Sequence, residues 1–122
     1  MKANELMIGD WVNETYEAVD GNMYEQEKQV GIHDFNDAKN FEPIPITPEI
    51  LEKNGFEYDE EGRVLTDNLV FWINDFRYIE YNPFNKAFLI LGVSSTFDGT
   101  CIYVHELQHI LKVCGINKKI EL

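Results

Sequence analysis

Apolar residues recur with the period of an α-helix near the end of the chain. The residues that share one side of this segment are Val104, Leu107, Ile110, Leu111 and Cys114. They are three or four positions apart, which is the spacing of an apolar stripe that packs on a core. Gly115 can take the left-handed conformation that ends a helix, and Ile116 can supply the capping contact. The pattern predicts a helix over residues 103–114, and residues 118–122 are expected to add a short strand.

The first forty residues have the pattern of a small β-rich unit. Gly9-Asp10 is a turn signal directly before the strand-forming pair Trp11-Val12, an opening that is common in small SH3-like barrels. Asp20-Gly21-Asn22 is a turn signal of the kind that joins two strands. Residues 28–33 alternate between apolar and polar, which predicts a half-buried strand. The polar residues 36–40 are expected to form a loop.

Prolines and a threonine mark a short helix in the middle of the chain. Residues 42–46 must be extended, because each proline fixes its own φ and restricts the residue before it. Thr47 is then a suitable N-cap, with Pro48 at the first helical position. Asn54-Gly55 ends the helix, and Phe56 can fold back as the hydrophobic contact of the cap.

From residue 56 to residue 91, short apolar runs alternate with turn signals, which predicts an antiparallel meander. Asn74-Asp75 has the length and chemistry of a two-residue hairpin loop, whereas residues 94–100, which contain Asp98-Gly99, are expected to be a loop. The expected strands are residues 56–58, 64–66, 69–73, 76–81 and 86–91, with turns at 59–62 and 82–85. These elements predict an α+β fold: a β-rich, SH3-like N-terminal unit, an antiparallel meander, and a C-terminal helix packed on the sheet.

The 122 residues fit a single domain, with a possible subdivision into a β-rich unit over residues 1–41 and the remainder over residues 42–122. The beginning of the chain lacks a basic stretch followed by an apolar run. The longest apolar run, residues 87–91, is too short to cross a membrane. We therefore expect a cytoplasmic protein in which Cys101 and Cys114 are reduced thiols in or near the core.

The net charge of −12 is concentrated in the first half of the chain. Residues 1–61 contain 16 acidic and 4 basic residues, whereas residues 62–122 contain 6 of each. Such a surface repels a phosphate backbone, so direct nucleic-acid binding is not expected. The acidic half can be a solubilising face, a surface for a basic protein, a weak cation site, or a surface that imitates DNA and occupies a DNA-binding protein.

One motif has the pattern of a zinc peptidase. His105 and His109 are four residues apart, so both rings leave a helix on the same side, and Glu106 stands where such enzymes carry the general base. A catalytic zinc needs a third protein ligand. Residues 112–122 contain no histidine and only one carboxylate, Glu121. The remaining candidates, His33, Asp98 and Cys101, could serve only by folding back.

A helical projection also argues against a zinc site. It places His105, Gln108, His109 and Lys112 opposite the apolar stripe, so the histidines are expected to point to solvent. A metal held there would lack supporting groups around its ligands.

The other candidate groups give weaker signals. Residues 94–96 lack the glycines of a nucleophile elbow, and Glu60-Glu61 stand in an expected turn. Four aromatic residues, Trp11, Trp72, Phe76 and Tyr78, could line a ligand surface, but aromatic residues on strands are more often part of a core, and we assign them there.

Three segments of the chain are similar in sequence to segments of a known group of proteins. They are NELMIGDWV from Asn4, EPIPITPEIL from Glu42 with the following Asn54-Gly55-Phe56, and YVHELQH from Tyr103. Together they resemble a group of small uncharacterised proteins that are common in Bacteroidetes genomes, their prophages and phages. In that group the third segment commonly reads Val-His-Gln-Leu-Gln-Asn, so Glu106 and His109 depart from it. The resemblance implies an origin in a mobile element and carries over no catalytic residue.

We therefore expect a non-enzymatic binding or accessory protein of phage or prophage origin that contacts a protein partner. No catalytic, cofactor-binding or metal-ligating residue is expected, and neither is a cofactor, a direct nucleic-acid contact or a membrane contact. The enzyme alternative is a zinc-dependent hydrolase that uses His105, Glu106 and His109. The third hypothesis is a DNA-mimic inhibitor that uses the acidic N-terminal half.

Overall fold

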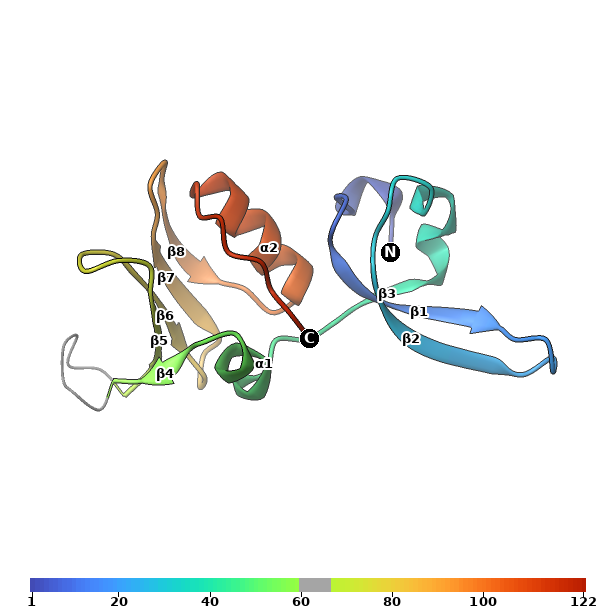
Figure 1. Cartoon of the computed structure of the whole chain (residues 1–122), viewed down its shortest axis with the longest axis horizontal. Helices are drawn as coiled ribbons and strands as arrows, with labels where there is room; N and C mark the ends of the chain where they lie inside the picture. Colours follow the sequence, from blue (N-terminus) through green and yellow to red (C-terminus); the bar gives the residue numbers. More distant parts are fainter. Residues whose placement is uncertain (60–66) are drawn as a thin grey trace. The chain divides into compact units, whose positions relative to one another are not determined.

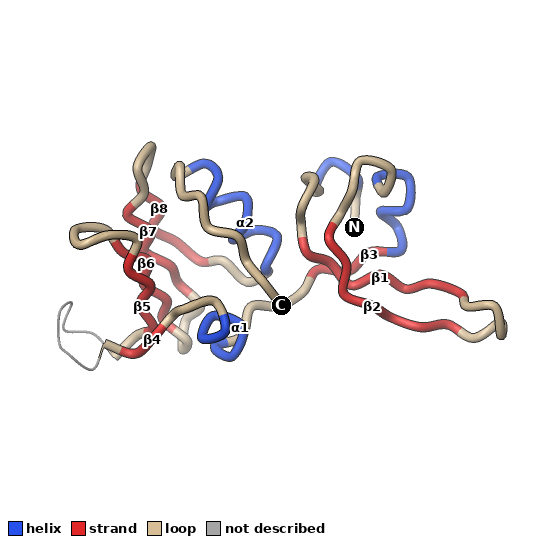
Figure 2. The backbone as a smooth tube through the Cα atoms, viewed as in Figure 1, coloured by secondary structure: helices blue, strands red, loops and turns tan. Residues whose placement is uncertain are grey.

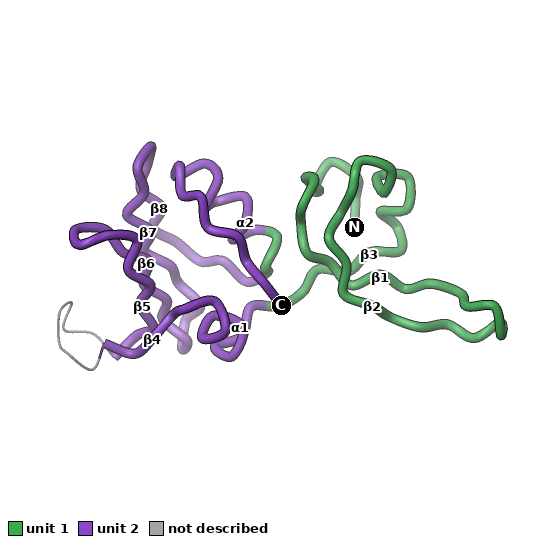
Figure 3. Tube along the Cα trace, viewed as in Figure 1, with its two compact units in different colours: residues 1–45, 103–105 green, residues 46–102, 106–122 purple. Residues whose placement is uncertain are grey.

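The chain forms two compact units. The computed structural model describes residues 1–59 and 67–122. Unit 1 comprises residues 1–45 and 103–105, and unit 2 comprises residues 46–102 and 106–122 (Figure 3). The chain therefore passes between the units at three points. The single domain, with its possible subdivision after residue 41, stays a prediction.

The described elements confirm the α+β class and the antiparallel meander (Figure 1). In chain order they are the 3₁₀ helix η1 (Ala3–Glu5), β1 (Trp11–Glu17), β2 (Met23–Gln29), the 3₁₀ helix η2 (Phe35–Asn40), β3 (Phe41–Pro43), α1 (Pro48–Lys53), β4 (Glu57–Tyr58), β5 (Leu69–Trp72), β6 (Tyr78–Asn82), β7 (Ala87–Leu91), β8 (Thr96–Thr100) and α2 (Val104–Val113). One sheet has the order β2-β1-β3, and the other runs β4-β5-β6-β7-β8. All strand pairs are antiparallel.

Unit 1 is built around the β1–β2 hairpin. Both predicted turns are confirmed: Gly9 before β1 has φ +92°, and Gly21 between the strands has φ +82°, a region that glycine occupies without a Cβ clash. On its other side β1 pairs with β3, but only at residues 12–14. The buried apolar residues of the unit form one core from Leu6, Val12, Val30, Ala38 and Phe41.

Two predictions in unit 1 are wrong. Residues 28–33 do not form a strand of their own, because β2 ends at Gln29 and Ile32 is 70% exposed. The chain turns here because the Asp34 carboxylate accepts a hydrogen bond from the Gly31 N–H (2.6 Å), a side-chain contact that competes with strand pairing. Residues 36–40, expected as a loop, belong to η2, where Ala38 reaches the core.

The caps predicted for the first helix of unit 2 are confirmed. Thr47 Oγ1 accepts a hydrogen bond from the Ile50 N–H (3.2 Å), which satisfies one of the N–H groups left over at the start of α1. At the other end Gly55 has φ +91°, and the Phe56 N–H donates to the Leu51 carbonyl (3.0 Å). Phe56 is buried, as its capping role requires.

The five-stranded sheet of unit 2 buries one of its faces. Leu69, Tyr81 and Phe88 stand opposite one another on β5, β6 and β7, and all three are almost fully buried. Glu80 and Leu89, at alternate positions on β6 and β7, are more exposed, whereas Val70 at the equivalent position of β5 is buried. Both α1 and α2 lie on the same side of the sheet (Figures 1 and 2). The helices therefore cover the apolar face.

Two loop predictions in the meander are wrong. The expected two-residue turn is a longer loop between Trp72 and Tyr78, in which Asn74 Oδ1 accepts hydrogen bonds from the N–H groups of Phe76 (2.8 Å) and Arg77 (2.9 Å). Residues 96–100 form the edge strand β8, because pairing with β7 overrides the local turn signal of Asp98-Gly99. The expected strand at residues 64–66 and most of the expected turn at 59–62 lie outside the described residues.

The C-terminal helix is confirmed, with its apolar stripe buried. Val104, Leu107 and Leu111 of α2 are buried, and so is Cys114 directly after its end. Gly115 has φ +75°, and the Ile116 N–H donates to the Leu111 carbonyl (2.9 Å), as the predicted cap requires. Cys101 is also buried, and neither cysteine forms a disulfide. No helix in the described part of the chain is both long enough and apolar enough to cross a membrane.

The short strand expected at residues 118–122 is absent from the structure. The buried side chain of Asn54 takes the place of a partner strand: its amide NH₂ donates to the Glu121 carbonyl, and its Oδ1 accepts from the Glu121 N–H, both at 2.7 Å. The Asn54 side chain thus satisfies both backbone groups of Glu121. The preceding residue, Ile120, is buried.

Candidate functional site

The histidine pair of the zinc-like motif is divided between two environments. His105 is 7% exposed and its ring stacks on Tyr103, with 6.0 Å between ring centroids, whereas His109 is half-buried. The prediction that both rings point to solvent is therefore wrong for His105. Residues 103–105 pack within unit 1, where the Val104 N–H donates to the Ile44 carbonyl (2.8 Å). A projection of the helix alone could not show these neighbours.

The structure does not assemble a set of metal ligands around these histidines. Within residues 1–59 and 67–122, no group of three or more His, Cys, Asp or Glu side chains is placed to hold a metal ion. His33, Asp98 and Cys101 therefore do not complete a site with the motif. The described residues offer no support for zinc-dependent hydrolysis.

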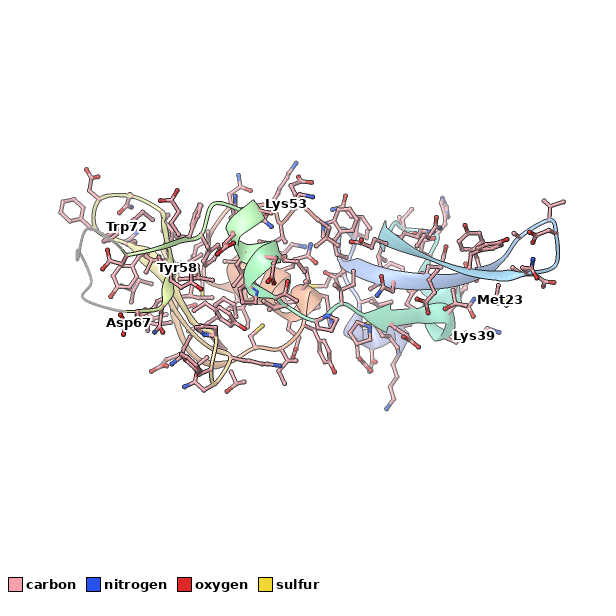
Figure 4. All side chains as sticks on the ribbon, turned by 90° about the horizontal axis from the view of Figure 1, so that it is seen from below. Met23, Lys39, Lys53, Tyr58, Asp67 and Trp72 are labelled. Atoms are coloured by element: carbon pink, nitrogen blue, oxygen red, sulfur yellow. The ribbon has the colours of Figure 1, made fainter. Side chains whose placement is uncertain are left out.

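The other predicted candidates have structural positions. Phe76 is 88% exposed in the β5–β6 loop, so its assignment to the core is wrong, and Trp72 and Tyr78 are half-buried with their rings 5.2 Å apart. Figure 4 labels the side chain of Trp72. In the segment 94–96, the Ser95 hydroxyl donates to the Val113 carbonyl (3.3 Å), which holds the end of α2. Glu60 and Glu61 lie outside the described residues.

The β1–β2 hairpin carries exposed acidic residues on both of its strands. The strands pair without interruption from Trp11–Gln29 to Glu17–Met23. Because β3 covers only residues 12–14 of β1, the part beyond these residues is a two-stranded ribbon (Figure 1). Its turn is held by Asp20, which accepts hydrogen bonds from the Asn22 N–H (2.9 Å) and the Tyr24 hydroxyl (2.7 Å). These bonds lower the pKa of Asp20, with the tyrosine making the larger contribution.

Four carboxylates gather on one face of this hairpin. Residues 13, 15 and 17 of β1 share a face, and their partners across the strands are Glu27, Glu25 and Met23. On the other side, Asn13 pairs with Glu42 of β3. We call the resulting surface the acidic face; it consists of Glu17, Glu25, Glu27 and Glu42, all of them exposed. No lysine or arginine occurs from residue 3 to residue 27.

Sequence reasoning located the excess of acidic residues but missed this face. The alternation of Glu25 and Glu27 was the available signal, since alternate residues of a strand share a face. The contributions of Glu17 and Glu42 depend on the register of β1 with its two partners, which the sequence does not reveal.

The hairpin also exposes apolar side chains near its turn. Tyr16 and Tyr24 face each other with their ring centroids 6.0 Å apart. Val19 is fully exposed at the turn, and Met23 is 62% exposed; Figure 4 labels Met23 on β2. Exposed apolar groups rimmed by charge are typical of protein-binding surfaces.

A cluster of charges holds the base of the hairpin. Lys28 donates to the carboxylates of Asp34 (2.8 Å) and Glu14 (3.4 Å). The Lys28 ammonium, followed by the Gly31 N–H, lowers the pKa of Asp34. Asp34 in turn raises the pKa of Lys28. Glu14 also accepts a hydrogen bond from the Gln26 side chain (2.8 Å).

We expect Asp34→Asn to lower the free energy of unfolding by about 1 kcal/mol at neutral pH, because it removes a partly exposed ion pair. A carboxyl whose pKa is lowered in the folded state stabilises that state above its unfolded pKa, and this contribution is lost as the pH falls. The difference between wild type and variant should therefore shrink below the usual aspartate pKa of 3.8. Urea denaturation of both proteins at neutral and acid pH measures this difference in the free energy of unfolding. Asp37→Asn, at an exposed position nearby, should change the free energy of unfolding at neutral pH by less than about 0.5 kcal/mol. An Asp34→Asn difference that stays the same at acid pH would contradict this account.

Comparisons of the chain with models of protein families, with curated proteins and with solved structures find no significant match.

Proposed function

We propose that this chain is a non-enzymatic binding protein that attaches to a basic partner protein through the β1–β2 hairpin. The observation that carries the proposal is the acidic face, where four exposed carboxylates stand on one surface. Complementary charge guides association and excludes wrong partners. Met23, which lies on the same face, and Val19 at the turn supply exposed apolar contact area beside the charges. The resemblance of three segments to Bacteroidetes phage and prophage proteins supports a mobile-element origin.

The test removes the charge while keeping the shape of the hairpin. In the variant, Glu17, Glu25 and Glu27 are all replaced by glutamine. The control replaces Glu49, Glu52 and Glu121, which are exposed residues of unit 2, so that it has the same net charge as the variant. Polypeptides retained from a bacterial lysate are identified by mass spectrometry, and the affinity of the main one is then measured with purified proteins.

We expect a basic protein to bind the wild type and the control equally, and the hairpin variant at least about tenfold more weakly. Binding should also weaken as the salt concentration rises, because exposed charges are screened. Equal affinity of all three proteins would reject the proposal.

A narrower form of the proposal is that the partner is a DNA-binding protein and the acidic face imitates the phosphate backbone. It is favoured by the lack of any lysine or arginine from residue 3 to residue 27. Double-stranded DNA should then displace the partner from this chain in a competition assay. If DNA and this chain bind the partner simultaneously, the DNA-mimic form fails and the general form stands.

A further inference from the structure

The outer edge of β2 has no partner strand in the described part of the chain. β2 is the terminal strand in the order β2-β1-β3, and it pairs with β1 along all of its seven residues. Such an edge presents a row of backbone N–H and C=O groups that can pair with another strand. β2 contains no proline, and its register with β1 is unbroken. A proline and a β-bulge are two common protections of a strand edge, and β2 has neither.

Hydrogen bonds at the two ends of the hairpin show which residues of β2 face this edge. The Val30 N–H donates to the Asp10 carbonyl (2.8 Å), and the Ala18 N–H donates to the Asn22 carbonyl (2.9 Å). Bonded and non-bonded pairs alternate along an antiparallel ladder, so even-numbered residues of β2 bond to β1. The residues whose backbone groups point to the open edge are Met23, Glu25, Glu27 and Gln29.

Charge selects the strand that this edge can accept. The side chains of Glu25 and Glu27 belong to the same residues whose backbone faces outward, and both are exposed. If β2 paired with β2 of a second copy, carboxylates would lie beside carboxylates, which is unfavourable. A strand with lysine or arginine at alternate positions would instead place its charges beside these glutamates. The fit is therefore to a basic strand and not to a second copy.

We propose that β2 binds an extended, basic segment of the partner by β-strand addition. Backbone hydrogen bonds along the open edge hold the segment, and its lysine or arginine side chains contact the acidic face. This inference rests on the proposed function and adds to it the mode of binding and the kind of segment recognised.

The test compares two substitutions at one position. Glu27→Gln and Glu27→Pro remove the same charge, but only proline removes the N–H that faces the open edge. The probe is a capped eight-residue peptide that alternates lysine and valine, and its affinity is measured by calorimetry at low salt. We expect the proline variant to bind about tenfold more weakly than the glutamine variant. A peptide of the same composition with its lysines grouped at one end should bind more weakly to the wild type.

A second measurement avoids the effect of proline on folding. Amide hydrogen exchange of the wild type should slow at Glu25 and Glu27 when the alternating peptide binds, because their N–H groups become hydrogen-bonded. Equal peptide affinity of the glutamine and proline variants, or unchanged exchange at these two amides, would overturn strand addition. If charge removal at residues 17, 25 and 27 still weakens binding of the partner protein, the proposed function stands without strand addition. If charge removal has no effect, the proposed function fails as well.

Discussion

Replacing Phe88 by alanine is expected to lower the free energy of unfolding by about 3–5 kcal/mol. Phe88 is 1% exposed on β7, between β6 and β8, and its ring packs on Tyr81 with 4.6 Å between centroids. Truncation removes buried apolar surface and leaves a cavity that a sheet paired on both sides of β7 cannot close. Urea denaturation followed by circular dichroism measures the change.

The chain offers a matched control for this prediction. Phe84, in the turn between β6 and β7, is 94% exposed, so Phe84→Ala should change the free energy of unfolding by less than about 0.5 kcal/mol. The two substitutions delete the same atoms four residues apart. Similar losses at both positions would show that the packing described for the sheet is incorrect.

Gly92→Ala is expected to cost about 2–3 kcal/mol, because the substitution overpacks a contact between two backbone segments. A Cβ atom at Gly92 would lie 2.5 Å from the Ser95 carbonyl oxygen and closer still to the carbonyl oxygen of Cys114. Neither oxygen belongs to a flexible side chain. The Cys114 carbonyl already accepts a hydrogen bond from the Ser94 N–H (2.9 Å), so moving it also disturbs the contact between α2 and the β7–β8 connection.

Gly99→Ala provides the comparison for Gly92. Its Cβ would meet only the side chain of Phe97, at 3.2 Å, and a ring can shift where a carbonyl cannot. We therefore expect a change within about 1 kcal/mol, measured by the same denaturation experiment. If Gly92→Ala is as mild as Gly99→Ala, the close approach at the end of α2 is not a constraint on the fold.

Sequence reasoning succeeded where a few neighbouring residues decide the structure. The caps of α1 and α2 were predicted because Thr47 and the glycines at positions 55 and 115 act on backbone groups within a few positions. The same holds for the turns at Gly9 and Gly21.

It failed where distant residues decide the structure. Asp98-Gly99 is a turn signal by itself, but pairing with β7 makes it part of β8. His105 was placed in solvent because the stripe of α2 was considered without unit 1. The acidic face could be found only in part, because two of its four residues are brought there by strand register.

The first two residues of α2, Val104 and His105, belong to unit 1, and the remainder of the helix belongs to unit 2. The Val104 N–H, at the helix start, is bonded to the Ile44 carbonyl of unit 1, whereas Leu107 and Leu111 are buried in unit 2. Severing the chain between residues 45 and 46 would therefore not release two self-sufficient fragments. The larger fragment would retain residues 103–105 without the rest of unit 1, and the Val104 N–H at the start of α2 would lose its hydrogen bond to the Ile44 carbonyl. Separate expression of the two units would require a break within α2, so we expect neither unit to be a portable module.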